Sequence, residues 1–334
     1  MQSESASRQS NKRMVVLKQS IGRSIPFHRF CDFCSGSCQN PGPSDNEYVL
    51  VTNVWNESER ILKAFDYVLA QTKLPRVWLW MEDGSTDDTY DQIRKQAEEH
   101  PELEIWIERM PKKRRGNFFK LGKTHETIMG RVRNRIDSLR VTYLGILDVD
   151  TKPCPNYFAR MCWLLDNHPR LGAVSGYPIG EWEKRVAAQP MNSGKCIRWA
   201  IVRTIREYWD FCPDTFYNIK AMAQDYAVDV VRVPVFQDRP STNLTPAGVL
   251  RMGRVAYYGG RPLWAVVLRA LRRAVIRQHG TDMLRGYLME YARGTWRCKD
   301  SDVRRFFQEG SNPISSAISL FQALRRGKGQ QVSL

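Results

Sequence analysis

The sequence predicts an α/β fold in which helices cover both faces of a mostly parallel, Rossmann-like sheet, with a basic helical region after it. Short apolar runs alternate with segments of helical periodicity, which is typical of a parallel sheet. Hydrophobic residues make up 42% of the 334 residues, enough for a sizeable core. Arginine is abundant in the last third of the chain. This composition excludes a chain that is disordered throughout.

The elements follow from hydrophobic periodicity. Strands are predicted where short β-rich apolar runs occur, at 48–54, 76–81, 103–107, 141–147, 171–175 and 228–236. Helices are predicted where apolar residues recur three and four positions apart, at 57–71, 87–100, 123–139, 155–167 and 262–278. Thr86 or Asp87 is the expected cap of the second helix.

Composition divides the chain into three parts. Residues 1–46 are polar and end in the turn-forming stretch 40–45, so we expect an extension ahead of the fold. The α/β domain is expected over 47–242, in two halves, 47–178 and 179–242, and a basic amphipathic helical region over 243–334.

The extension contains four potential zinc ligands within eleven residues: His28, Cys31, Cys34 and Cys38. A zinc site usually draws its ligand pairs from two separated turns, so free thiols are the other interpretation. The eight cysteines of the chain, in a sequence without a secretory signal, are expected to be mostly reduced.

Charge predicts an anionic partner. The chain has 51 Lys and Arg against 35 Asp and Glu, a net charge of +16. Nucleic acid, a phosphate-rich substrate or an acidic membrane surface would each suit this excess. No apolar run approaches the roughly 20 residues that cross a bilayer, and residues 1–10 lack the apolar stretch of a signal peptide. We therefore expect a cytoplasmic protein.

Acidic residues gather where predicted strands end, although the protein is basic. Glu57 follows the first strand, Glu82 and Asp83 follow the second, and Asp148 and Asp150 follow the strand at 141–147. Parallel sheets bind ligands at the carboxyl ends of their strands. Alternate residues of an extended segment point the same way, so Asp148 and Asp150 could hold one Mg²⁺ or Mn²⁺ ion. The stretch 82–88 would also suit a plain turn and helix cap.

Residues 48–178 resemble the donor-binding half of a family-2 glycosyltransferase, which has the GT-A fold. The matching pieces are Val-Thr-Asn-Val-Trp-Asn-Glu (51–57), Leu-Ala-Gln-Thr (69–72), Glu-Asp-Gly-Ser-Thr-Asp-Asp-Thr (82–89), Gly-Lys (122–123) and Leu-Asp-Val-Asp (147–150). The resemblance implies that 47–178 is a nucleotide-sugar half and 179–242 an acceptor half.

The resemblance also implies roles for single residues. Contacts with the base and ribose of the nucleotide are implied for Asn56, Glu57, Glu82 and Asp83. Asp148 and Asp150 correspond to the metal and diphosphate site, and Lys123 would approach the diphosphate.

The acceptor half offers two candidates for the base that this chemistry needs, Asp210 and Asp214. Asp214 fits better because Pro213 precedes it and a helix-like run follows, although it could simply cap that helix. Downstream, Arg239-Pro-Ser-Thr242 resembles an Arg-Pro-Thr element found in a subset of the family. Arg239 is expected to offset diphosphate charge as the leaving group forms.

The helical region is strongly basic, with thirteen Lys and Arg against four Asp and Glu between 250 and 305. The helix at 262–278 has an apolar face that consists of Leu263, Trp264, Val267, Leu268, Leu271 and Val275. Arginines occupy most of the rest of its surface. Such a helix could lie on an anionic bilayer or pack its apolar face on the enzyme core.

Together these features predict an inverting, Mn²⁺- or Mg²⁺-dependent glycosyltransferase. It would move a sugar from a nucleotide-diphosphate sugar to a hydroxyl of a lipid-linked or cell-surface glycan, or of a polyprenyl-phosphate-type acceptor, at the inner face of the membrane. A zinc-containing nucleic-acid-binding protein is the alternative from the charge. A sugar nucleotidyltransferase is the alternative from the sheet, but the loop after the first strand lacks the Gly-rich basic sequence that it would need.

Overall fold

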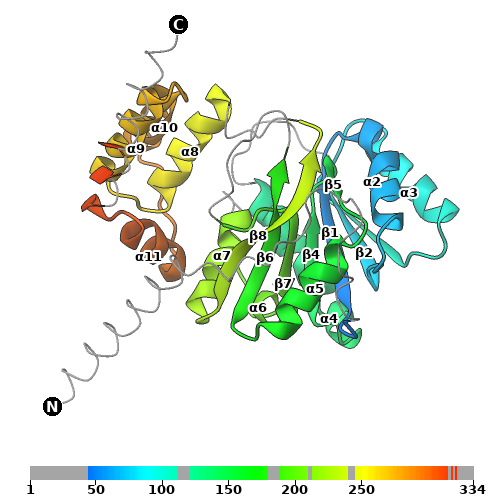
Figure 1. Cartoon of the computed structure of the whole chain (residues 1–334). Helices are drawn as coiled ribbons and strands as arrows, with labels where there is room; N and C mark the ends of the chain where they lie inside the picture. The colour runs from blue at the N-terminus through cyan, green and yellow to red at the C-terminus, as the bar shows by residue number, and fades with distance from the viewer. Residues whose placement is uncertain are drawn as a thin grey trace, which may run out of the picture.

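An eight-stranded sheet forms the centre of the molecule (Figure 1). The computed structural model describes residues 44–111, 120–179, 189–209, 213–239, 245–314, 317–318 and 320–321. The strands are β1 (Tyr48–Val54), β2 (Val77–Glu82), β3 (Ile105–Arg109), β4 (Tyr143–Leu147), β5 (Thr151–Pro153), β6 (Leu171–Ile179), β7 (Ser193–Arg198) and β8 (Ala227–Gln237). Their order across the sheet is β3-β2-β1-β4-β7-β6-β8-β5.

The sheet is mixed, with parallel pairing between β3 and β2, β2 and β1, β1 and β4, and β6 and β8. β7 runs antiparallel to both β4 and β6, and β5 runs antiparallel to β8. The predicted fold class, an α/β protein with a mostly parallel sheet, is confirmed.

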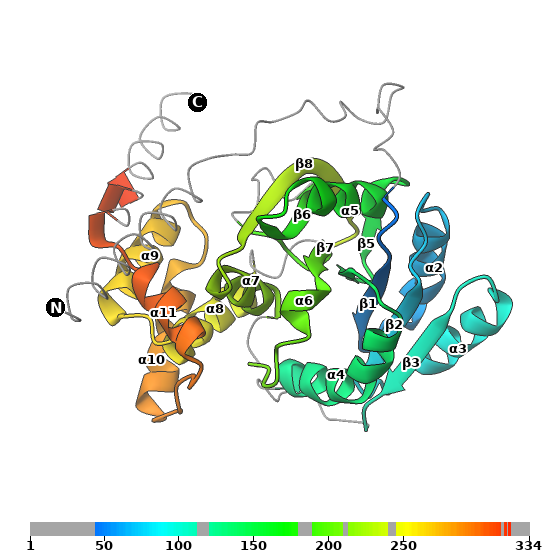
Figure 2. The same ribbon diagram turned by 90° about the horizontal axis from the view of Figure 1, so that it is seen from below.

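Helices cover both faces of the sheet, as predicted. One face packs against α2 (Ile61–Leu69), α3 (Thr89–Glu99) and α5 (Tyr157–Asn167). The other packs against α4 (Lys120–Ser138), α6 (Trp199–Val202) and α7 (Pro213–Ala223). Figure 2 shows α4 and α2 on opposite sides of the central strands.

The two cores follow from the alternation of side chains along each strand. Leu50 lies beside Trp78 in the sheet, and both pack with Phe65 of α2. The next pair, Val51 and Leu79, belongs to the opposite core, with the buried side chains of α4. Each central strand is therefore apolar on both faces, which explains the continuous apolar runs in the sequence.

Three details differ from the sequence predictions. The segment expected as one helix over 57–71 begins with a 3₁₀ turn, η1 (Ser58–Arg60). The residue that precedes α3 is Asp88, which makes no side-chain cap hydrogen bond, so the prediction of Thr86 or Asp87 as the cap was wrong. Strand β7 was not predicted because its sequence, Ser-Gly-Lys-Cys-Ile-Arg, is polar at three of six positions although five of the six residues are buried.

After the sheet the chain forms the predicted helical region, which contains α8 (Pro246–Tyr258), α9 (Leu263–Val275), α10 (Gly280–Ala292) and α11 (Ser301–Glu309). Only α9 was predicted as an individual helix. Helices α8 and α10 approach closely at two glycines: a Cβ on Gly253 would lie 1.9 Å from the Met283 carbonyl oxygen. On the opposing helix, a Cβ on Gly286 would lie 2.0 Å from the Leu250 carbonyl oxygen.

The helical region is joined to the sheet domain through α7, beside which it lies in both views (Figures 1 and 2). The Lys220 ammonium on α7 binds the carboxylates of Asp300 and Asp302, the latter at 2.9 Å. Tyr258 and Val303 join the core beneath α7. None of the helices in the described part of the chain is both long enough and apolar enough to span a bilayer.

Candidate active site at the carboxyl edge of the sheet

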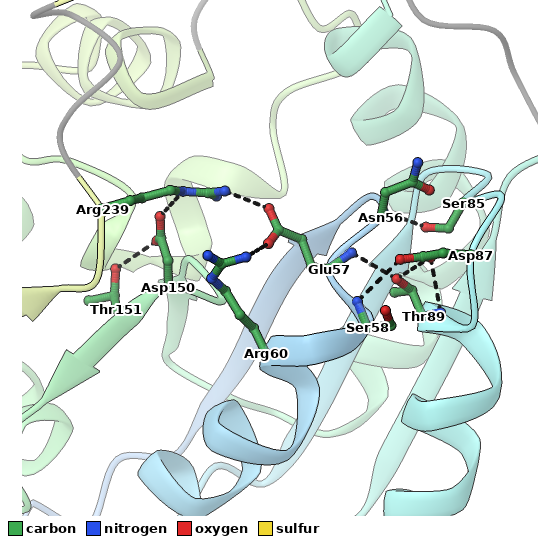
Figure 3. Close-up of polar contacts among 10 residues, drawn as sticks. All are labelled: Asn56, Glu57, Ser58, Arg60, Ser85, Asp87, Thr89, Asp150, Thr151 and Arg239. Atoms are coloured by element: carbon green, nitrogen blue, oxygen red, sulfur yellow. Dashed lines mark hydrogen bonds and ion pairs between the residues drawn. The ribbon is translucent and has the colours of Figure 1, made fainter.

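The predicted site residues come together where β1, β2 and β4 end. These three strands are neighbours and parallel, so the loops that follow them meet at one edge of the sheet. Figure 3 shows the polar contacts at this edge.

The loops after β1 and β2 are held together by hydrogen bonds around Asn56. Its backbone has a φ of 52°, in the left-handed region that asparagine tolerates better than most residues. The Asn56 N–H donates to Ser85 Oγ (3.0 Å), and its side-chain Oδ1 accepts from the Thr86 N–H (2.8 Å). The Glu57 N–H donates to Thr89 Oγ1 at 2.8 Å. The nucleotide-binding loop predicted from the sequence is therefore anchored at several points.

The Asp87 carboxylate completes this contact between the loops. It accepts hydrogen bonds from the N–H and hydroxyl of Thr89 and from the Ser58 N–H. Partial burial acts to raise the pKa of Asp87, but the hydrogen bonds from Thr89 and Ser58 outweigh it and lower the pKa below its usual value. Asp87 thus stays ionised and structural.

Glu82 and Asp83 lie deeper than the loop. Glu82 is completely buried; one of its oxygens accepts from the Ser85 N–H and the other from Arg109 Nε at 2.9 Å. The Asp83 carboxylate accepts from Thr124 Oγ1 on α4 at 2.5 Å. Both carboxylates support the turn after β2. The nucleotide contacts that the resemblance implies for them stay predictions.

Arg239 connects the acidic residues of two strand ends (Figure 3). Its Nε donates to Asp150 Oδ2, and its Nη1 donates to Glu57 Oε1 at 2.8 Å. The other Glu57 oxygen accepts from Arg60 Nη1, also at 2.8 Å. Burial acts to lower the pKa of Arg239, but the charges and hydrogen bonds of Asp150 and Glu57 raise it overall. The guanidinium is therefore a permanent cation at this edge.

The short strand β5 explains why Arg239 reaches Asp150 from 89 residues away. Thr151 of β5 pairs with Gln237 of β8, which sets the residue before β5 beside the residues after β8. The Asp238 N–H also donates to the Asp150 carbonyl oxygen at 3.0 Å. β5 is only three residues long and carries no sequence pattern, so this juxtaposition could not be predicted.

The donor groups at this edge fit a hard divalent cation, which prefers oxygen ligands. Asp150 is 6% exposed, and its carboxylate already faces a cation, the Arg239 guanidinium. Among the described residues, no group of three or more His, Cys, Asp or Glu side chains is placed to hold a metal. Asp148 and Asp150 would thus supply two carboxylates, and the remaining ligands would come from the diphosphate and water. A metal ion bound to Asp150 Oδ2 would displace the Arg239 guanidinium from that oxygen.

A buried network behind the loop was not predicted from the sequence. Asn53, near the end of β1, donates from Nδ2 to His125 Nε2 at 2.9 Å, and His125 Nδ1 lies 3.2 Å from the Tyr217 hydroxyl. Burial lowers the pKa of His125 to about 4, against the opposing charge of Asp83. A neutral imidazole therefore links β1 and α4 to α7. Lys195 of β7 is also completely buried, with Nζ 5.8 Å from the centre of the Tyr217 ring.

The structure leaves other predicted residues apart from this cluster or untested. Lys123 is exposed on α4, with Nζ 2.6 Å from Glu126 Oε1. Asp214 is the second residue of α7, but its side chain lies outside the described part of the structure. Asp210 and the potential zinc ligands, His28, Cys31, Cys34 and Cys38, also lie outside the described residues.

No protein-family model and no curated protein matches this sequence. Among solved structures, it is similar to a mannosyltransferase from Pyrobaculum calidifontis in complex with GDP-Man and Mn²⁺, with 15% identity, a TM-score of 0.48 and coverage of 95% of this chain and 93% of that chain. Glucosyl-3-phosphoglycerate synthase from Mycobacterium tuberculosis, in complex with Mn²⁺, UDP and glucosyl-3-phosphoglycerate, is 13% identical, with a TM-score of 0.43 and coverage of 59% and 74%. S. aureus TarS 1–349 is 13% identical, with a TM-score of 0.41 and coverage of 83% and 81%. At this distance the likeness carries no argument about activity, which has to come from the site itself.

Proposed function

We propose that this chain is an inverting glycosyltransferase that uses a nucleotide-diphosphate sugar. The observation that carries the proposal is the bridge from Asp150 to Glu57 through Arg239. It gathers acidic and basic groups from three strand ends at the one edge of the sheet where such folds bind ligands. A basic protein has no general reason to concentrate buried carboxylates there.

The anchored loop supports the donor part of the proposal. Asn56 and Glu57 stand at its rim, where they would contact the base and ribose, with Glu82 and Asp83 beneath them. Arg239, which is 45% exposed, has enough freedom to turn from the carboxylates toward a diphosphate. Lys123 would add a second cation from α4.

Asp148 and Asp150 would hold Mn²⁺ or Mg²⁺ together with the donor. A divalent ion bound there would supply Lewis-acid stabilisation of the departing diphosphate. The chain's own contribution is Arg239, which would help to balance the same negative charge.

Asp214 is the proposed base. It would take the proton of the acceptor hydroxyl while that oxygen forms a bond to the anomeric carbon and the bond from this carbon to the nucleoside diphosphate breaks. A single displacement from the opposite face inverts the configuration. Tyr217, three residues after Asp214 in the sequence, ties α7 to β1 through His125.

The acceptor is proposed to be a hydroxyl of a lipid-linked or cell-surface glycan. Residues 47–178 would bind the donor, residues 179–242 the acceptor, and residues 243–334 would form the basic helical part. The location at the inner face of a membrane belongs to the same proposal.

The first experiment is a thermal-shift screen of the full chain against UDP, GDP, dTDP, CMP and ADP, each with and without Mn²⁺. A ligand that binds only the folded state raises its melting temperature. We expect one nucleoside diphosphate to raise it, and only when Mn²⁺ is present. No response to any nucleotide, together with tight and salt-sensitive binding to RNA or DNA, would replace this proposal with the nucleic-acid-binding alternative.

The second experiment tests the base with Asp214→Asn. Loss of a general base typically lowers the rate 10²- to 10⁴-fold, so we expect transfer to a suitable acceptor to fall in that range. The thermal response to nucleotide and Mn²⁺ should stay as in the wild type. Normal turnover by the variant would remove Asp214 from the mechanism.

A further inference from the structure

Helix α9 carries its large apolar side chains on the outside of the molecule. Leu263, Trp264 and Leu271 are 45%, 41% and 49% exposed. The side chains that α9 buries are smaller: Ala265, Val266 and Ala270. A helix that only packs on a protein core has the opposite arrangement, with its largest apolar residues inside.

The exposed side chains form one continuous stripe. Leu263, Val267, Leu271 and Val275 recur at every fourth position, and Trp264 and Leu268 lie alongside them in the same turns. Val267, Leu268 and Val275 are half-buried, so no residue of the stripe is completely covered. These six residues are called the α9 stripe below. The sequence predicted this face but left open whether the enzyme core covers it, and the structure shows that the described part of the chain does not.

The face of α9 opposite the stripe is already packed against other helices, so α9 cannot rotate to bury the stripe. It packs on α8 and α10, where Val266 and Ala270 join a small core with Met283 and Tyr287. A Cβ on Gly280, at the start of α10, would lie 2.0 Å from the Ala270 carbonyl oxygen, so the helices are in close contact at that point. In both views α8 lies between α9 and the sheet (Figures 1 and 2). The buried face of α9 therefore belongs to the small core of the helical region and not to the core of the sheet domain.

The charged residues of α9 are all basic, and one of them, Arg272, borders the stripe. Helix α9 contains three arginines, Arg269, Arg272 and Arg273, and no acidic residue. Among the described residues, no ion pair joins Arg269 or Arg272 to a carboxylate. Most acidic residues of the neighbouring helices are already engaged: Glu290 binds Arg254 at 2.6 Å, Asp300 and Asp302 bind Lys220, and Asp282 lies 3.9 Å from His279.

We propose that the α9 stripe is a membrane-docking surface that lies in the headgroup region of a bilayer containing anionic lipids. Apolar Leu and Trp side chains enter the boundary between headgroups and acyl chains, and Arg272, which borders the stripe, binds lipid phosphates together with other basic residues of the helical region. A protein partner of ordinary composition would not explain why the helix that carries the stripe has three arginines and no acidic residue. The helix lies on the bilayer and does not cross it, in keeping with its thirteen-residue length.

The same helical region exposes further apolar side chains that would add to the contact area. Leu288 and Tyr291 are exposed on α10, and Trp296 follows that helix. Ile314, Ile318 and Phe321 are exposed at a spacing of four and three residues. Docking through this region would bring α7, to which it is joined through Lys220, toward the lipid surface.

The experiment is co-sedimentation of the full chain with phosphatidylcholine vesicles, with or without 30% phosphatidylglycerol. It needs no donor or acceptor, so it can fail without affecting the proposed catalytic function. We expect binding to the anionic vesicles to exceed binding to neutral vesicles at least fivefold and to weaken as salt is added, because the phosphate contacts are screened.

Two variants separate the apolar and the charged contributions. Trp264→Ser with Leu271→Ser should weaken binding to anionic vesicles at least tenfold, since it removes two large apolar side chains from the interface. Arg269→Gln with Arg272→Gln should remove most of the preference for anionic lipid. The controls are Leu62→Ser, an exposed leucine on α2, and Lys63→Gln with Lys95→Gln, exposed lysines of α2 and α3. Both controls should bind as the wild type does.

Three results would overturn the proposal. In the first, the wild-type chain does not sediment with anionic vesicles. In the second, the Trp264→Ser, Leu271→Ser variant binds these vesicles as tightly as the wild type does. The third is a dimer in sedimentation velocity that this variant converts to monomer, which would assign the stripe to a second copy of the chain. A melting temperature of the variant within a few degrees of the wild type would show that it is folded.

Discussion

Helices α2 and α9 are both strongly amphipathic, yet they use their apolar faces in opposite ways. On α2, Phe65 is completely buried, with its ring 4.6 Å from that of Trp78 between helix and sheet. On α9, Leu271 and Trp264 are close to half exposed while two alanines face inward. The periodicity that predicts a helix gives the direction of its apolar face but not what covers it. The first helix helps to build the core of the sheet domain, and the second exposes its large apolar side chains.

The contrast between the two helices should be largest in how much a substitution of an apolar side chain lowers the free energy of unfolding. Phe65→Ala removes a ring that no other side chain can replace, so we expect the free energy of unfolding to fall by about 3–5 kcal/mol. Urea denaturation measures it. Leu62→Ala, the exposed neighbour on the same helix, is the control and should be close to neutral. A loss below about 1 kcal/mol for Phe65→Ala would contradict the packing described for α2.

A second prediction concerns the buried network around His125 in the sheet domain and the dependence of stability on pH. The pKa of His125 is lowered to about 4 by burial, whereas an exposed histidine titrates near 6.5. The unfolded chain therefore binds one more proton between about pH 4 and pH 6.5, so stability declines as the pH falls through this window. The loss in the free energy of unfolding that is due to His125 reaches about 3 kcal/mol near pH 4.

The measurement is the free energy of unfolding against pH for the wild type and for His125→Gln. The variant should show a shallower slope between pH 6.5 and pH 4, because glutamine does not titrate. His168→Gln, a partly buried histidine after α5, serves as the matched control. Equal slopes in wild type and His125→Gln would show that His125 accepts its proton without cost in the folded protein.

The third prediction concerns the bridge through Arg239 at the edge of the sheet. If the guanidinium and a divalent ion compete for Asp150, then Arg239→Gln should tighten Mn²⁺ binding to the nucleotide-free chain. A partly exposed ion pair is worth about 0.2–1 kcal/mol, which corresponds to a roughly 1.4- to fivefold change in affinity. Titration of free Mn²⁺ by electron paramagnetic resonance measures it.

Arg60→Gln is the matched control, because Arg60 pairs with Glu57 at 2.8 Å but does not contact Asp150 in the structure. It should leave Mn²⁺ affinity unchanged. Equal effects of the two substitutions would indicate a general electrostatic change and not competition at Asp150.

The smallest effect is expected on α9. Leu271→Ala should change the free energy of unfolding by less than about 0.5 kcal/mol, since the side chain is half exposed and leaves no cavity. Urea denaturation next to Phe65→Ala gives the comparison directly. A loss above about 2 kcal/mol would mean that the chain itself buries Leu271 in solution.

The sequence predicted the parts of the fold that are apolar and periodic. β1, β2 and β4 are continuous apolar runs, and the acids that follow them could be assigned to one edge because parallel strands end together. β7 was not predicted because Ser193, Lys195 and Arg198 are polar residues, which do not indicate a buried strand. Burial of Lys195 depends on neighbours from other elements, which a local pattern does not contain.

Individual contacts in the site depended on tertiary structure. Asp150 and Arg239 were each singled out, but their contact arises because Thr151, in the short strand β5, pairs with Gln237 of β8. His125 was missed because a lone histidine in a helix gives no signal in the sequence, and only the fold brings Asn53 and Tyr217 to it. Residue types at strand ends were therefore predictable, whereas their partners were not.

The most direct test of the donor site is calorimetric titration with the nucleoside diphosphate that the thermal screen selects, in the presence and absence of Mn²⁺. The wild type should bind it tightly only with Mn²⁺, and Asp150→Asn should lose at least tenfold in affinity. Glu98→Gln, an exposed acid on α3, should bind as the wild type does. Undiminished Mn²⁺-dependent binding by Asp150→Asn would contradict the assignment of the carboxyl edge of β4 as the place where metal and diphosphate meet.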